Sequence, residues 1–270
     1  MNILLSRLLV ILNDEKSSSI YYHIAFSILV NFERIYMMSI IEVAELCAVS
    51  KSMISKFVRS MGFDDYKEFV TTAPFIENKY RNDLNYNTNV MGFMDNNSIH
   101  KYLEIIQADI EKFESSLDMK RIDELVQDLI SYKYIAAFGL LYSETAALDL
   151  QTKLAYNKKF IVTNLNDIKQ DEYIMNAGED TLIIIFSNSG DYIDKYSMSE
   201  GKPKKRCFFR TKAKVVLITS NRKMEEDPRV DLCIPIYYTT NIQTHRVIFQ
   251  LFTDIITQRY RYFLRMMETE

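Results

Sequence analysis

Residues 39–62 read SIIEVAELCAVSKSMISKFVRSMG, a pattern typical of two short helices joined at a tight corner. Ser39 and Glu42 have the spacing of a capping box, in which each side chain satisfies a free backbone N–H at the helix start. Ser50 is the expected N-cap of the second helix, and Gly62 is the expected residue just after its end. The stretch therefore predicts a helix-turn-helix, whose second helix would enter the major groove of DNA.

The polar face of this second helix carries hydroxyl and basic side chains and no acidic one. Residues in the first turn of a recognition helix reach base edges, so Lys51 and Ser52 are the expected base-side residues. Lys56 and Arg59, farther along, are the expected phosphate contacts. The complete set of predicted DNA-binding residues is Ser50, Lys51, Ser52, Ser55, Lys56 and Arg59. A three-helix interaction module that never touches DNA is the competing interpretation, because helix pairs of this kind are frequent.

The composition of the chain limits where this stretch can belong. Its 270 residues are 48% hydrophobic, which is enough to bury the cores of two domains. The formal net charge of −3 means that DNA binding must come from a local basic patch, duplicated in a homodimer or higher homo-oligomer. The three cysteines are scattered singly, which predicts neither a disulfide framework nor a metal site and suits a reducing cytoplasm.

The N-terminus is apolar but is interrupted by Arg7, so it predicts an amphipathic helix rather than a signal peptide. No later segment approaches a membrane span, and the predicted localisation is cytoplasmic without a membrane partner. Residues 1–75 are the predicted helical DNA-binding domain, 76–98 an asparagine-rich linker, and 99–270 a second domain that dimerises and binds a ligand. No cofactor is predicted.

The second domain alternates apolar runs with helical patterns. We expect strands at 134–140, 159–163, 180–187, 214–220 and 230–236, with helices at 143–156 and 170–177 between them. Continuous apolar strands separated by helices predict a parallel sheet covered by helices on both faces. The predicted fold class is therefore two domains, an all-α helix-turn-helix domain followed by an α/β domain.

Hydroxyl side chains follow two of these predicted strands. Ser143 comes after the first strand, and the sequence Ser-Asn-Ser-Gly at 187–190 comes after the third. Each precedes a helix whose free N–H groups would favour an anion, and ligands of parallel sheets bind at the carboxyl ends of the strands. The pattern therefore predicts a phosphate site at this edge.

Both halves resemble one known family. The run SIIEVAELCAVSKSMISKFVRSMGFDDYKEF, at 39–69, is similar to the N-terminal domain of RpiR/MurR-type bacterial transcription regulators. In that family a capped helix, a Val-Ser corner, a recognition helix and a Gly-Phe-x-x-(Tyr/Phe)-x-x-(Phe/Leu) tail follow in this order. Met53 stands where a Thr is common, and Lys56 where an Arg is common. Neither departure disturbs the core, but both affect which bases would be read.

The runs FSNSG, VVLITS and VDLCIPI resemble the SIS (sugar isomerase) domain that forms the second half of these regulators. Its strand ends read roughly G-x-G-x-S and S-x-S-G-x-T, and its loop binds the phosphate of a phosphosugar. Here Leu141 replaces the second Gly, which would narrow the pocket, and Tyr192 replaces the Thr. The residues that the resemblance implies as ligand contacts are Ser143, Ser187, Asn188, Ser189 and Gly190, and we add His245 at the start of the final helix.

The resemblance implies a regulator that binds a double-stranded DNA operator and senses a phosphorylated sugar. The closing helix, at 244–264, is the expected dimer contact. Two other classes stay open: a sugar-phosphate isomerase, and an interaction scaffold that has lost its ligand. An isomerase needs a general base, for which Glu144 and His245 are the only candidates near the site. Neither belongs to a recognisable catalytic pattern, so no catalytic residue is predicted, and Ser187 and Ser189 have the alternative role of helix caps.

Overall fold

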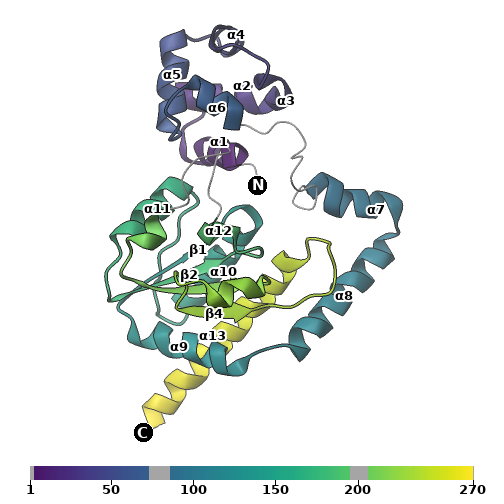
Figure 1. The fold of residues 1–270 in the computed structure, drawn as a ribbon, viewed down its shortest axis with the longest axis vertical. Helices are drawn as coiled ribbons and strands as arrows, with labels where there is room; N and C mark the ends of the chain where they lie inside the picture. Colours follow the sequence, from purple (N-terminus) through teal and green to yellow (C-terminus); the bar gives the residue numbers. More distant parts are fainter. Residues whose placement is uncertain (1–2, 73–85, 195–205, 270) are drawn as a thin grey trace. The chain divides into compact units, whose positions relative to one another are not determined.

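A computed structural model of the chain describes residues 3–72, 86–194 and 206–269 (Figure 1). The described residues up to 72 form one compact unit, and those from Tyr86 onward form a second. The part of the predicted linker before Tyr86 lies outside the described residues, as do residues 195–205. The remainder of the predicted linker, from Tyr86, belongs to the second unit.

The first unit is all-α, as predicted. Its core contains fully buried side chains from successive helices, including Leu4, Ile24, Val43, Phe57 and Phe69. The helices are α1 (Ile3–Asp14), α2 (Ile20–Val30), α3 (Phe32–Ile35), α4 (Ile40–Leu46), α5 (Lys51–Ser60) and α6 (Tyr66–Thr72).

Local interactions fix the ends of α4 and α5. The capping box is present, because Ser39 N–H donates to the Glu42 carboxylate at 2.6 Å and Glu42 N–H donates to Ser39 Oγ at 3.3 Å. Ser50 Oγ accepts from the backbone of α5, and Gly62 follows its end with a φ of 79°. These predictions are confirmed. The corner itself bends at Ala48, whose φ of 51° is left-handed without the usual glycine.

Arg7, which interrupts the apolar N-terminus in the sequence, is buried in α1. Its guanidinium donates to the backbone oxygen of Met61 at 2.5 Å and lies 5.4 Å from the centre of the Phe63 ring. A cation is favourable where free carbonyls end a helix. Arg7 therefore holds α1 against the C-terminal end of α5.

The second unit contains a parallel sheet with the strand order β1-β2-β3-β4. The strands are β1 (Tyr134–Phe138), β2 (Thr181–Phe186), β3 (Lys214–Thr219) and β4 (Leu232–Pro235). The predicted strand at 159–163 is wrong, because there only Val162 pairs with β1, in an isolated bridge to Ala136. An Asx turn at Asn164 and Asn166 leads the chain away, so the pairing does not extend.

Helices cover both faces of this sheet, as predicted. On one face, β1 to β4 share a buried cluster with α9, α10 and α13, and α13 packs against both α9 and α10 (Figure 1). On the other face, the Phe138 ring contacts the Tyr173 ring of α11 at 5.7 Å. The helical segments are η2 (Asn87–Met91), α7 (Gly92–Asn96), α8 (Ile99–Ser115), α9 (Met119–Ser131), η3 (Leu141–Ser143), α10 (Glu144–Ala155), α11 (Asp167–Asn176), α12 (Asp191–Asp194), η4 (Cys207–Phe209), η5 (Arg222–Glu226) and α13 (His245–Thr269). Within the described ranges, no helix combines the length and the apolar composition needed to cross a bilayer.

Candidate functional site

The predicted recognition helix, α5, presents its basic residues to solvent. Helical geometry of about 100° per residue places its predicted contacts, from Lys51 to Arg59, within one arc of about 140°. The exposed members of this set are Ser50, Lys51, Ser52, Lys56 and Arg59. Buried Ile54, Phe57 and Val58 hold the opposite side of the helix in the core. The arrangement leaves one basic face free for a DNA backbone.

Two of the predicted hydroxyls also serve the helix itself. Ser50 Oγ accepts from Met53 N–H at 3.2 Å and lies 2.9 Å from Ser52 Oγ. Ser55, which is half-buried, donates to the backbone oxygen of Lys51 at 3.2 Å. These bonds order the start of α5, and DNA contacts by Ser50 and Ser55 stay a prediction, as do the base contacts of Lys51 and Ser52.

The first loop (residues 139–143) connects β1 to α10. A buried Ser143 side chain, 8% exposed, lies at its end, and its hydroxyl makes no hydrogen bond to any described residue. Leu141 has a φ of 53°, so it adopts the left-handed conformation for which glycine is the usual residue. The Glu144 side chain accepts a hydrogen bond from the Leu141 N–H. The loop thus keeps a glycine-like backbone despite the larger side chain.

Replacing Gly139 with alanine should lower the free energy of unfolding by about 3 kcal/mol. The added Cβ would lie 2.6 Å from the backbone carbon and oxygen of Ser143 and 2.9 Å from the Glu144 nitrogen, and backbone cannot move aside cheaply. Urea denaturation measures the change. Gly178→Ala is the control, because its Cβ would meet only a carboxylate oxygen of Asp180 at 3.3 Å. Equal losses in the two variants would contradict this account of the first loop.

The second loop (residues 187–190) connects β2 to α12. Ser187 Oγ accepts from Tyr192 N–H at 3.2 Å, and Ser189 Oγ accepts from Asp191 N–H at 3.3 Å. Both hydroxyls therefore cap the start of α12, which is the role that the sequence left open as an alternative to ligand binding. A hydroxyl that accepts a hydrogen bond still has its proton to donate, and neither serine donates to a described residue. Gly190 turns the chain with a φ of 77°.

Asn188 is held by residues that the sequence analysis missed. Its backbone oxygen accepts hydrogen bonds from Thr219 Oγ1 at 2.9 Å and Ser220 Oγ at 2.8 Å. Its side-chain oxygen accepts from the Tyr238 hydroxyl at 2.7 Å. Asn221 also supports the loop by donating to the Ser189 backbone oxygen at 2.9 Å. Their position in the sequence was a signal, because Thr219 ends β3 and the other groups follow β3 or β4, at the same carboxyl edge of the sheet.

Tyr192, which departs from the family pattern, is buried on the α11 side. Its hydroxyl donates to Gln170 at 2.5 Å, and its ring contacts Phe208 at 6.0 Å. Gln170 in turn donates to the Gly139 backbone oxygen at 3.1 Å. Since β1 and β2 pair in parallel up to Phe138, this bridge confirms that the first and second loops lie side by side. The large side chain of Tyr192 is thus anchored against α11 and η4 and does not fill the second loop.

Helices α10 and α13 run in parallel with their starts at the same end. The first residue of each, Glu144 and His245, has one buried polar atom without a hydrogen-bond partner among the described residues. Burial raises the pKa of Glu144 to about 7, although the hydrogen bond from the Leu141 N–H lowers it in part. The carboxylate oxygen Oε2 has no partner among the described residues. Burial, with a smaller contribution from Arg246, lowers the pKa of His245 to about 4, and its Nδ1 also has no partner. His245 is therefore neutral at pH 7 and offers a hydrogen bond rather than a counter-charge to phosphate.

Among the described residues, aromatic packing links His245 to the second loop. Its ring contacts Phe249 at 5.8 Å, and Phe249 contacts Phe186, the residue before Ser187, at 5.4 Å. The structure therefore places the two loops at the ends of adjacent strands, whereas His245 reaches the second loop through two phenylalanine rings.

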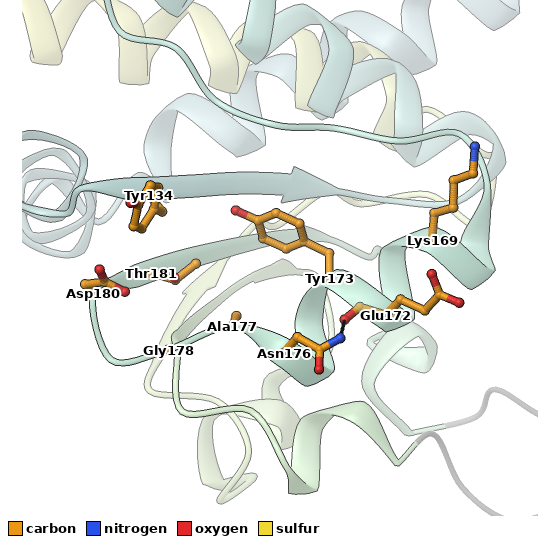
Figure 2. A pocket seen from close by; sticks show the side chains of 9 residues that line it. All are labelled: Tyr134, Lys169, Glu172, Tyr173, Asn176, Ala177, Gly178, Asp180 and Thr181. Carbon is orange, nitrogen blue, oxygen red and sulfur yellow. Dashed lines mark hydrogen bonds between the residues drawn. The ribbon is translucent and has the colours of Figure 1, made fainter.

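A surface hollow of about 560 Å³ lies at the other end of the sheet (Figure 2). Tyr134 and Thr181, the first residues of β1 and β2, line it together with residues of α11 such as Tyr173. Figure 2 shows Lys169 and Glu172 at its rim, with Asp180 at the opposite side. None of the predicted ligand residues lines this hollow, so it is distinct from the carboxyl edge.

Comparison with known proteins assigns the first unit. A protein-family model described as "Helix-turn-helix domain, rpiR family" matches residues 14–72, which include α2 to α6. The first unit is an rpiR-family helix-turn-helix domain. A helix-turn-helix transcriptional regulator of Providencia stuartii, itself uncharacterized, is 25% identical over 229 residues, covering 83% of this chain and 79% of its own length. The comparisons thus assign a helix-turn-helix domain of the rpiR family to the first unit, and the Providencia stuartii protein is similar to most of the chain.

Solved structures assign the fold of the second unit. A Listeria monocytogenes protein, provisionally described as a sugar-phosphate isomerase, superposes with a TM-score of 0.52 at 12% identity over 65% of this chain and 92% of its own. The Vibrio vulnificus NanR protein, in complex with ManNAc-6P, aligns over 95% of this chain and 90% of its own with a TM-score of 0.48 and 15% identity. The Listeria superposition confirms the predicted SIS-like fold.

Proposed function

We propose that the chain is an rpiR-type transcriptional regulator that binds a phosphorylated sugar at the carboxyl edge of its sheet and changes its operator affinity in response. The observation that carries the proposal is the pair of adjacent loops after β1 and β2, with Ser143, Ser187 and Ser189 as hydroxyls that have protons to donate. The first turn of α10, a 12-residue helix, begins at the same edge and adds backbone N–H groups.

We infer that the protein acts as a homodimer, because one recognition helix makes too few contacts for tight binding and a dimer reads two half-sites. Exposed apolar side chains in the second unit support this. Ile99 and Leu103, one turn apart in α8, are 67% and 55% exposed. Met266 and Met267, near the end of α13, are also exposed. Since its operator is genomic DNA, the place of action that we propose is the bacterial cytoplasm.

Sugar-phosphate isomerisation is the second candidate, and one observation favours it. Glu144 has a buried carboxylate oxygen without a partner and a pKa of about 7, which suits a general base. The helix-turn-helix domain favours a sensing role for the same edge, so we propose that the chain is not an enzyme. Turnover of sugar phosphates by a protein without DNA affinity would reverse this ranking.

Calorimetric titration with hexosamine and pentose phosphates should give saturable heat with at least one of them. In the double variant Ser187→Ala/Ser189→Ala we expect the affinity to fall by at least about 100-fold, because two hydroxyl donors to a charged group are lost. The matched control is Ser115→Ala/Ser131→Ala, which removes two exposed hydroxyls at the ends of α8 and α9. No heat with any phosphate, or equal affinity of both variants, would remove the ligand proposal.

A further inference from the structure

Arg246, in the first turn of α13, is enclosed by aromatic side chains. Its guanidinium carbon lies 5.2 Å from the centre of the Tyr86 ring and 5.1 Å from that of Tyr142, and the two ring centres are 5.9 Å apart. It also hydrogen-bonds to Tyr102 of α8 and to Tyr86. A cation at a helix N-terminus is disfavoured by the helix dipole, so these contacts rather than the helix explain its position.

The two tyrosines belong to different functional segments. Tyr142 lies in the first loop, directly before Ser143. Tyr86 is the first described residue after 73–85, the stretch that joins the second unit to the helix-turn-helix domain along the chain. Arg246 is therefore in contact both with the proposed ligand loop and with the start of the second unit.

A second attachment holds the same segment. Asn89, in η2, donates to the Asn241 backbone oxygen at 2.8 Å and accepts from Gln243 N–H at 2.8 Å. Both partners lie in the loop that leads into α13. The start of the second unit is thus held by side-chain contacts from the residues around His245, and not by a continuous helix or a strand of the sheet.

We propose that Arg246 is the positioning residue through which ligand occupancy of the first loop is transmitted to the segment at 86–91, the described part of the second unit that lies nearest to the helix-turn-helix domain along the chain. The inference rests on the proposed function. A ligand that hydrogen-bonds to Ser143 changes the freedom of Tyr142, and the cluster of Tyr86, Tyr142 and Arg246 passes that change to Tyr86. The ligand then biases the segment between two arrangements, and the operator affinity follows by linkage.

The test uses the full chain and three variants. Operator affinity is measured by fluorescence anisotropy with and without a saturating phosphate, with glucosamine 6-phosphate and ribose 5-phosphate as probes. Arg246→Met keeps the length of the side chain and removes its charge, and Arg246→Lys restores a cation. Arg259→Met is the matched control, because Arg259 also lies over two rings of α13, Tyr262 at 5.0 Å and Phe263 at 5.3 Å.

In the wild type we expect the phosphate to change operator affinity about tenfold, within the range usual for coupled sites. Arg246→Met should reduce that ratio to less than about twofold, while its phosphate affinity and its operator affinity without phosphate each change less than about threefold. Arg246→Lys should recover part of the ratio, and Arg259→Met should keep all of it.

Two results would overturn the inference alone: an undiminished ratio in Arg246→Met, or a loss of phosphate affinity that accounts for the whole loss of response. The second result would make Arg246 a ligand contact. A wild type that binds no phosphate in calorimetry would instead overturn the proposed function, and the role of Arg246 with it.

Discussion

Asp109→Ala should lower the free energy of unfolding of the second unit by about 4 kcal/mol. Asp109 lies in α8 and is fully buried, and within the described part of the chain its carboxylate has no basic partner. Its carboxylate instead accepts four hydrogen bonds from the loop before α13: Thr239 N–H at 2.7 Å, Thr239 Oγ1 at 2.8 Å, Thr240 Oγ1 at 2.9 Å and Thr244 Oγ1 at 2.6 Å. Alanine would leave these donors without their acceptor in a buried site.

The pH dependence follows from the same contacts. Burial by itself raises the pKa of Asp109, but the hydrogen bonds from the threonines outweigh it and the pKa is lowered. A pKa that is lower in the folded state stabilises the protein above the unfolded value of about 3.9, and this contribution is lost as the pH falls through the folded pKa. The difference between wild type and Asp109→Ala should therefore shrink below about pH 4.

Urea denaturation at pH 7 and pH 3 measures both effects. Glu111→Ala removes an exposed carboxylate from the same helix, and we expect it to change the free energy of unfolding by less than about 0.5 kcal/mol. A loss in Asp109→Ala below about 1 kcal/mol at pH 7 would show that the loop before α13 does not depend on this carboxylate.

Lys56→Ala/Arg59→Ala should weaken operator binding by about 10³-fold at moderate salt. Both side chains are exposed on the free face of α5, so they are available to phosphates and contribute little to the core. Each lost phosphate contact reduces the slope of log K against log salt concentration by about 0.9, so the slope should fall by about 1.8 per protomer. Mobility shifts on fragments upstream of the protein's own gene, at several salt concentrations, measure both quantities.

Lys112→Ala/Lys120→Ala is the control for charge. It removes the same number of exposed positive charges from the second unit, at α8 and α9. If both double variants lose affinity equally, the effect is one of net charge and α5 is not the DNA-reading helix.

The sequence was sufficient where a local pattern determines the structure. The spacing of Ser39 and Glu42 predicted a capping box, and Gly62 marked the end of α5, because both devices depend only on neighbouring residues. The apolar runs at β2 and β3 predicted buried parallel strands. Ala48 escaped prediction, because nothing in its side chain signals the left-handed conformation that the corner imposes.

Features that depend on distant contacts were not predictable in this way. Val162 has an apolar strand-like sequence around it, yet the turn that follows limits it to a single bridge. Asp109 falls on the inward side of α8 between Ile106 and Phe113, which was a signal of burial. The four donors to its carboxylate, however, belong to threonines 130 or more residues away along the chain. The role of Arg246 likewise arises only when α13 brings it against two tyrosines.

The most direct test of ligand-controlled DNA binding is the operator affinity of the full chain as a function of sugar-phosphate concentration. We expect a saturable change of at least about fivefold, with a midpoint that matches the dissociation constant from calorimetry and that is lost in Ser187→Ala/Ser189→Ala. An operator affinity that stays constant while the sugar phosphate binds would contradict the proposed sensing function.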